Sequence, residues 1–203
     1  MIDPWWVKQL NKPLNRLARV AVGVGLTANQ VTLMSFLIGM LALPALAYGH
    51  YLWALIAILL NRFGDGLDGA IARQQGATDA GGYLDISLDF IFYSAVPFGF
   101  LLANPAQHGA AAGLLMLTFM GTGATFLAFA AIAGKRGIDN PRYPSKSLHY
   151  MGGLTEGFET IVVFTLLCLV PQWFNPIAYS FAVLCWVTTI SRLYAGYQTL
   201  GGD

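Results

Sequence analysis

The sequence has few charged residues and few cysteines. Charged side chains make up 10% of its 203 residues, apolar side chains make up 56%, and the mean hydropathy is +0.59. This balance excludes an ordinary soluble domain and is typical of a membrane protein. The two cysteines, Cys168 and Cys185, both lie in apolar stretches, which gives neither a disulfide framework nor the spacing of a zinc site.

Long apolar stretches account for most of the chain. Six of them, each near the ~20 residues that cross a bilayer, are expected as helices at about 31–49, 51–73, 83–103, 109–133, 153–170 and 177–198. We therefore predict an all-α integral membrane protein with a six-transmembrane-helix bundle over residues 31–198. One domain is expected over residues 1–203, because the spans use nearly all of the chain.

Residues 4–20 precede the first apolar stretch and mix apolar with basic side chains. Trp5, Trp6 and Leu10 stand at helical spacing beside Lys8 and Lys12. This pattern predicts a short N-terminal amphipathic helix that lies on the membrane surface, in contact with lipid headgroups. No nucleic-acid partner is expected, because the rest of the chain offers no soluble basic domain.

The charged residues are distributed unevenly between the predicted turns. The turns at 49–51, 104–108 and 171–176 contain no Lys, Arg, Asp or Glu, whereas all 11 Lys and Arg lie at the other ends of the spans or in the segments that join them. Since basic residues concentrate on the cytoplasmic side of membrane proteins, both termini and the turn at 74–82 are expected to be cytoplasmic.

Four aspartates flank that turn in two pairs. Asp65 and Asp68 are three residues apart and Asp85 and Asp89 are four apart, so each pair projects from one face of its own helix. A chain that folds back at 74–82 brings the two pairs together. Four carboxylates so close to apolar helices require cations, and oxygen ligands favour Mg²⁺ or Mn²⁺ in a two-metal site. Asp89 also has the chemistry of a general base for a hydroxyl group.

The order of these residues resembles a family signature. Asp65-x2-Asp68-Gly69-x2-Ala72-Arg73-x8-Gly82-x3-Asp85-x3-Asp89 agrees at every fixed position with DxxDGxxAR-x8-GxxxDxxxD of the CDP-alcohol phosphatidyltransferases. Residues 27–32, TANQVT, resemble the TPNxLT segment of that family. The whole chain, including the GLTEG segment at 153–157, is similar to a bacterial inner-membrane branch of the family.

The resemblance implies an enzyme of phospholipid synthesis. CDP-diacylglycerol would be the donor, a small alcohol would attack the phosphorus that bears the lipid, and CMP would leave. Gly69 would let the diphosphate approach the helix, and the Arg73 guanidinium would bind its oxygens. Gly82, Thr27 and Asn29 are further candidates for the nucleotide site, although the last two also suit helix caps. The resemblance also implies a homodimer in the bacterial inner membrane.

The acceptor alcohol depends on weaker signals. Glu156 and Glu159 are three apart at the start of the fifth predicted span and share a helix face. Two carboxylates favour a neutral polyol or an amine, although pairing with Lys146 or Arg192 for structure is an equal alternative. Arg136 and Lys146 keep a phosphorylated acceptor open, with glycerol 3-phosphate as the leading alternative.

Other classes of protein fit the sequence less well. A divalent-cation transporter would show inverted repeats around a midplane site, which the chain lacks. A UbiA-type prenyltransferase would carry a second aspartate-rich motif in its later half, where only Asp139, Glu156, Glu159 and Asp203 follow Asp89. Purely structural ion pairs are disfavoured, because only Arg62 and Arg73 are near the aspartates.

Overall fold

The computed structural model describes residues 3–138 and 153–201, with side chains from residue 13 onward, and every regular element in these ranges is helical. The elements are α1 (Asp3–Gly23), α2 (Ala28–Met40), α3 (Ala42–Ala47), α4 (Tyr51–Gln75), α5 (Asp79–Ala103), α6 (Pro105–Arg136), α7 (Gly157–Leu169), the short 3-10 helix η1 (Pro171–Trp173) and α8 (Phe174–Leu200).

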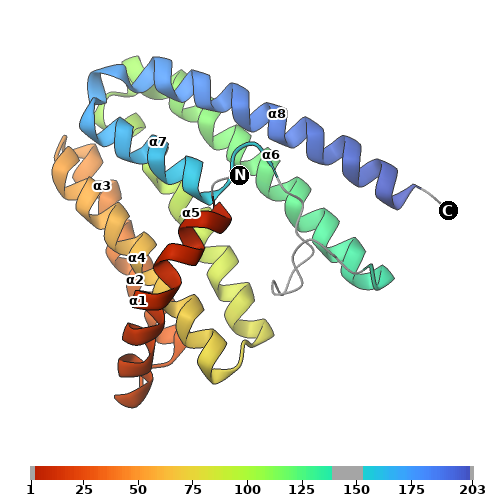
Figure 1. Ribbon diagram of the computed structural model, residues 1–203. Coiled ribbons are helices and arrows are strands. Elements are labelled where there is room, and N and C mark those ends of the chain that lie inside the picture. The colour runs from red at the N-terminus through yellow and green to blue at the C-terminus, as the bar shows by residue number, and fades with distance from the viewer. Residues whose placement is uncertain (1–2, 139–152, 202–203) are drawn as a thin grey trace.

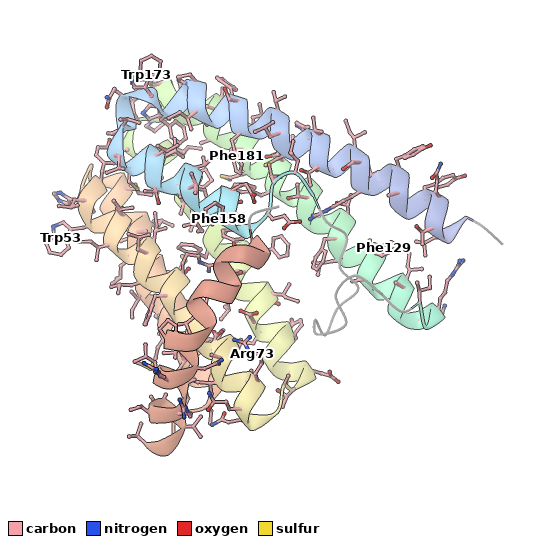
Figure 2. The ribbon with its side chains drawn as sticks, viewed as in Figure 1. Trp53, Arg73, Phe129, Phe158, Trp173 and Phe181 are labelled. Carbon is pink, nitrogen blue, oxygen red and sulfur yellow. The ribbon has the colours of Figure 1, made fainter. Side chains whose placement is uncertain are left out.

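The turns without charged residues lie at one end of the bundle. The α3–α4, α5–α6 and α7–α8 connections gather at the upper left of Figure 1, while the α4–α5 turn lies at the opposite end. Asn175 ties two of the uncharged turns together, because its side-chain nitrogen donates to the Gln107 carbonyl at 2.9 Å. Trp53 and Trp173 are exposed and point outward at this end (Figure 2), as expected of aromatic side chains at a membrane boundary.

Four segments of the described chain are long and apolar enough to cross a membrane: Ala28–Ala47, Asp79–Ala103, Pro105–Arg136 and Pro171–Leu200. The all-α membrane fold is therefore confirmed. Two of the six predicted spans are not among them, since α4 carries charged residues in its second half and α7 has only 13 residues. The count of six spans stays a prediction, as does the single domain over residues 1–203.

The first predicted span is divided into two helices. The structure ends α2 at Met40 and begins α3 at Ala42, whereas the sequence led us to expect one helix over 31–49. Pro44 is the physical reason, because it has no N–H to donate to the Met40 carbonyl and its ring crowds that group. Hydrogen bonding resumes where the Ala45 N–H donates to the Leu41 carbonyl at 3.2 Å.

The N-terminal helix α1 packs against α2 and α4. Ala18 and Ala21 are buried in a small apolar cluster with Val31, Ala70 and Ile71. Arg16 and Arg19 of the same helix are exposed. A helix is thus present where one was predicted over 4–20, and it is longer than expected. Its position on the membrane surface stays a prediction.

Two close contacts hold the helices that carry the aspartates. Gly64 of α4 lies directly against Ser35 of α2, where any β-carbon would overlap the serine hydroxyl. On the other side, Phe100 of α5 stacks on Phe174 of α8 with ring centroids 4.4 Å apart, and both side chains are fully buried. These contacts fix α4 and α5 within the bundle and so fix the faces that meet between them.

Candidate active site

The turn between α4 and α5 is shorter than the sequence indicated. Helix α4 continues to Gln75 and α5 begins at Asp79, so the turn occupies three residues rather than 74–82. Gly76 adopts φ +95°, a backbone conformation that side chains disfavour, and Thr78 caps α5 by accepting from the Gly81 N–H at 3.1 Å. Gly82 consequently lies in the first turn of α5 and not in the loop.

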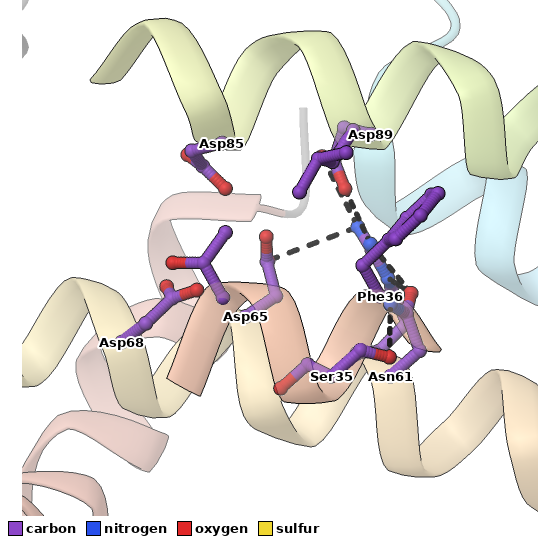
Figure 3. A pocket seen from close by; sticks show the side chains of 10 residues that line it. Ser35, Phe36, Asn61, Asp65, Asp68, Asp85 and Asp89 are labelled. Atoms are coloured by element: carbon purple, nitrogen blue, oxygen red, sulfur yellow. Dashed lines mark hydrogen bonds and ion pairs between the residues drawn. The ribbon is translucent and has the colours of Figure 1, made fainter. Parts of the chain in front are cut away.

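Three of the four aspartates converge across this hairpin. Asp65, Asp68 and Asp85 each place one carboxylate oxygen within 4.8 Å of the others (Figure 3). Asp68 is buried, and its Oδ2 has no hydrogen-bond partner among the described residues. A buried carboxylate oxygen without a partner is costly unless a cation binds it. The donor set therefore fits a hard divalent ion.

Asp89 lies one helical turn further along α5 and pairs with an arginine. The Arg62 guanidinium donates through Nη1 to Asp89 Oδ2 at 3.3 Å and through Nη2 to the other carboxylate oxygen. Arg62 also lies 3.7 Å from an Asp65 oxygen. Asp89 is thus outside the group of three oxygens that converge in the described structure, and its predicted roles as fourth ligand and general base stay predictions.

Two cavities adjoin the carboxylates. The smaller has space of about 10 Å³ and is bordered by all four aspartates and Arg62. The larger, of about 410 Å³, reaches Asp68 and Asp85 from the side of the α4–α5 turn. The larger cavity is also lined by four of the five residues that the sequence assigned to the nucleotide: Thr27, Asn29, Gly69 and Gly82.

Arg73, the fifth of those residues, does not line the larger cavity but lies beside Gly69, which does. It is exposed in the last turn of α4 (Figure 2), and a β-carbon added to Gly69 would lie 3.4 Å from its Nη1. Thr27 and Asn29 also have local roles, since Thr27 caps α2 and the Asn29 carboxamide lies close to Gly81. Both interpretations of these two residues therefore remain open.

Two of the predicted acceptor residues, Glu156 and Glu159, cap the start of α7. Glu156 accepts from the Gly153 N–H at 2.9 Å, and Glu159 accepts from the Glu156 N–H at 3.1 Å, so the two carboxylates cap the start of α7. Arg136 donates to the Leu200 carbonyl at the end of α8 at 2.8 Å. Lys146 lies outside the described residues. The acceptor roles of these four residues stay predictions.

Sequence reasoning missed the surroundings of Arg62 and of the start of α7. Arg62 was considered only as a nearby cation, although its position three residues before Asp65 places both on one face of α4. Thr188 was not considered at all. It accepts the N–H groups of Leu154 and Thr155 at 3.1 and 3.0 Å, a contact across 34 and 33 residues that no local pattern indicates.

Known proteins resemble this chain along most of its length. Residues 25–191 match the model of the family described as CDP-alcohol phosphatidyltransferase. Inner membrane protein YnjF of Escherichia coli (strain K12) is 55% identical over 200 residues, covering 98% of this chain and 97% of YnjF. Archaetidylinositol phosphate synthase of Pyrococcus horikoshii is 28% identical over 196 residues, with 95% of each chain covered.

Solved structures share the fold. The crystal structure of Mycobacterium tuberculosis phosphatidylinositol phosphate synthase (PgsA1) with CDP-DAG bound has a TM-score of 0.74 and 23% identity, covering 91% of this chain and 93% of PgsA1. PgsA1 in complex with manganese and citrate has a TM-score of 0.73, also at 23% identity, covering 91% of this chain and 88% of PgsA1.

Proposed function

This chain belongs to the CDP-alcohol phosphatidyltransferase family, and from that premise we propose that it transfers a phosphatidyl group from CDP-diacylglycerol to the hydroxyl of a small alcohol and releases CMP. It is a membrane enzyme of this transferase type. The observation that carries the proposal is the convergence of Asp65, Asp68 and Asp85 beside a cavity lined by the residues expected at the nucleotide. The PgsA1 structures, named for bound CDP-DAG and for manganese, support the same donor and a divalent ion.

The carboxylates would hold Mg²⁺ or Mn²⁺ against the diphosphate. Asp65, Asp68 and Asp85 offer three hard oxygens, and the unpartnered Oδ2 of Asp68 is the strongest sign that an ion belongs there. A divalent ion at this position neutralises phosphate charge and makes the phosphorus more electrophilic. Asp68 and Asp85 line the larger cavity, so an ion held by the aspartates would lie beside a diphosphate bound there.

The remaining site residues would bind and orient the donor. Gly69 leaves the α4 backbone accessible to the diphosphate, and the Arg73 guanidinium beside it offers a planar pair of donors to phosphate oxygens. Thr27, Asn29 and Gly82 line the same cavity and would contact the nucleotide. Asp89 would accept the proton of the attacking hydroxyl.

We place the enzyme in the bacterial inner membrane with the site and both termini in the cytoplasm. The similarity to an Escherichia coli protein named for the inner membrane supports the location. The uncharged turns at the end opposite the aspartates support the orientation. The family resemblance is the ground for a homodimer, which stays a prediction.

The acceptor is the open part of the proposal. The first candidate is a neutral polyol or an amine, which the two carboxylates of Glu156 and Glu159 favour. Glycerol 3-phosphate, or another phosphorylated alcohol, is the second candidate. A phosphorylated alcohol is supported by the names of one relative and one structural neighbour, which both contain an inositol phosphate and do not mention glycerol. A panel of neutral and phosphorylated alcohols separates the two candidates.

The decisive experiment supplies the purified protein with CDP-diacylglycerol, Mg²⁺ and each alcohol in turn, and measures CMP release and lipid product. We expect CMP only with a divalent ion and a matching alcohol. If the protein moves divalent cations across liposomes and releases no CMP with any alcohol, it is a transporter and the proposal is wrong.

Asp89→Asn tests the proposed base. We expect kcat to fall by about 10²–10⁴-fold, the usual contribution of general-base catalysis, while CMP binding survives. Asp79→Asn is the matched control, because Asp79 is an exposed acid in the first turn of the same helix. Near-normal turnover by the Asp89 variant would remove Asp89 from the mechanism.

A further inference from the structure

The described half of α1 has one buried face and two exposed ones. The buried face includes Ala18 and Ala21 and packs against α2 and α4. Arg16 and Arg19 are exposed, and no carboxylate of the described residues pairs with either, since the ion pairs there all involve Arg62. Between the basic and the buried face runs an apolar stripe, 45% to 72% exposed, of Leu17, Val20 and Val24. An exposed apolar stripe beside arginines is typical of a helix that lies in a membrane interface.

The connection between α1 and α2 keeps α1 close to the membrane boundary. Helix α1 ends at Gly23, and the candidate span that contains α2 begins at Ala28. Even when extended, the chain from the one residue to the other covers at most about 18 Å. In the structure it is folded back, because Gly25 adopts φ +84° and the Leu26 N–H donates to the Ala21 carbonyl at 3.0 Å. The end of α1 is thus held at the surface where the span enters the bilayer.

Helix α1 crosses the last turns of α4 behind the larger cavity (Figure 1). Ala70 and Ile71 of α4 belong to the apolar cluster that α1 joins, whereas Gly69 of the same turn lines the cavity. Leu14 of α1 packs closely on Gly66, where an added β-carbon would lie 3.2 Å from the leucine Cδ1. These turns of α4 therefore have α1 on one side and the cavity on the other.

Two glutamines at the end of α4 extend this contact. The side-chain nitrogen of Gln74 donates to the Asn15 carbonyl of α1 at 3.2 Å, and that of Gln75 donates to the Leu26 carbonyl at 2.9 Å. Gln75 also lines the larger cavity, as does Thr27, which directly follows Leu26. The segment that ends α1 is thus joined to the wall of the cavity.

We propose that α1 is a lipid-sensitive brace of the larger cavity: Arg16 and Arg19 seat it on anionic headgroups, and its contacts with α4 hold the wall of the cavity. The occupant of the exposed face of α1 is an anionic phospholipid surface, because such a surface satisfies the apolar stripe and the arginines together. The inference rests on the proposed function for the nucleotide in the cavity. It adds a regulation, in which the charge of the surrounding membrane sets the affinity for that nucleotide.

The charge of the two arginines sets the size of the effect. A basic side chain close to an anionic bilayer strengthens the attraction about fivefold, which gives about 25-fold for two. Because coupling between two binding events is reciprocal, the anionic surface raises the affinity for the nucleotide by no more than this factor. On a neutral surface the apolar stripe is the main attraction that remains. The last turns of α4 then lose part of their support, and helix ends are the first parts to open locally.

The first test is hydrogen exchange of the wild-type protein in nanodiscs, with phosphatidylcholine alone compared with a mixture of phosphatidylcholine and phosphatidylglycerol. We expect α1 over 13–23 and α4 over 66–75 to exchange about 5- to 25-fold more slowly in the anionic discs. The start of α6 over 105–112, at the uncharged end of the bundle, is the internal reference. Equal rates in both discs would overturn the inference, and so would a change in α1 with none in α4.

The second test removes the two charges and keeps the buried face of α1. We expect Arg16→Gln with Arg19→Gln to lose most of the difference between the two kinds of disc. Arg16→Lys with Arg19→Lys, which keeps the charges, should retain it. Lys135→Gln, a change at an exposed basic residue in the last turn of α6, is the second control and should also retain it. A double glutamine variant with the full wild-type difference would overturn the role of the arginines.

Calorimetry with CMP and Mg²⁺ in the same nanodiscs connects the brace to the cavity. We expect the wild type to bind CMP about 5- to 25-fold more tightly in the anionic discs, and the double glutamine variant to bind it nearly equally in both. CMP binding by the wild type that is independent of lipid charge retains the proposed function and overturns the inference. Lipid-dependent exchange of α1 and α4 with no CMP binding in any disc supports the brace and counts against the proposed function.

Discussion

The α4–α5 hairpin and the start of α7 each contain two acidic residues three positions apart, but the two pairs make different contacts. Asp65 and Asp68 are three residues apart, as are Glu156 and Glu159. The aspartates face Asp85 on another helix and leave a buried oxygen without a described partner. The glutamates accept N–H groups of their own turn. The spacing predicts that two acidic side chains share one face of a helix. A metal site also requires ligands from a second helix opposite that face, as Asp85 provides for Asp65 and Asp68.

The largest expected effect comes from removing one of the converging carboxylates. Asp85→Asn should lower kcat/KM by more than about 100-fold, because loss of a mere outer partner of a metal already costs about 10–100-fold. Mn²⁺ affinity should fall in parallel, which calorimetry measures. Chelation of the wild type should abolish activity, and added Mg²⁺ or Mn²⁺ should restore it. Full activity after exhaustive chelation would contradict the metal site.

Thr188→Val should loosen the start of α7 and leave the aspartates intact. The variant keeps the shape of a fully buried side chain but removes the acceptor of two backbone N–H groups, those of Leu154 and Thr155. We expect a loss of about 2 kcal/mol in the free energy of unfolding, within the usual cost of unsatisfied buried groups. Thermal denaturation in detergent measures it.

A matched threonine provides the control for that change. Thr118 is also fully buried, but its hydroxyl donates to the Leu115 carbonyl of its own helix. Thr118→Val should therefore cost much less stability than Thr188→Val. Mn²⁺ binding should be unchanged in both variants. If Thr188→Val weakened Mn²⁺ binding, the two regions would be coupled and the comparison between them would fail.

Gly69→Ala should affect the donor more than the fold. The added β-carbon would meet only the flexible end of Arg73, at 3.4 Å, so α4 should tolerate it. The methyl group would occupy the path of the diphosphate, and KM for CDP-diacylglycerol should rise about tenfold, equivalent to ~1.4 kcal/mol. Gly109→Ala is the control, because a β-carbon added there would meet no atom within 4 Å beyond its chain neighbours and the backbone of its own helix. Equal effects of both changes would mean that Gly69 has no special place at the site.

The smallest effect is expected for Glu156→Gln and Glu159→Gln. Glutamine keeps an oxygen that accepts the same N–H groups, so the cap survives and stability should stay within about 1 kcal/mol of wild type. We expect KM for the acceptor to stay at its wild-type value as well. A marked rise in that KM, with unchanged stability, would show that the carboxylate charge serves the acceptor and would break the contrast with the aspartates.

The sequence predicted those parts of the structure that depend on local patterns. Apolar length predicted the helices, and helical spacing with an intervening glycine-rich turn predicted that Asp65, Asp68 and Asp85 converge. The family signature led to the residues that line the larger cavity. In each case the information lies within a few helical turns of the chain.

The parts that were missed depend on competition between partners. Asp89 has the spacing of a fourth ligand, but the sequence did not indicate that it pairs with Arg62 on the neighbouring helix. Glu156 has the spacing of a binding residue, but the sequence did not indicate that its carboxylate accepts the Gly153 N–H at the start of α7. The anchoring of α7 by Thr188 joins segments more than thirty residues apart. The periodicity of the sequence does not predict which partner a side chain contacts when that partner lies on another helix or in the backbone.

The three-residue turn between α4 and α5 also bears on the order in which the protein is made. Because it tethers the two helices so closely, the carboxylates of Asp65, Asp68 and Asp85 meet through contacts of short sequence separation, which form quickly. The start of α7, by contrast, needs α8 before Thr188 can hold it. Synthesis proceeds from the N-terminus. The three carboxylates can therefore meet before the second half of the chain has been synthesised.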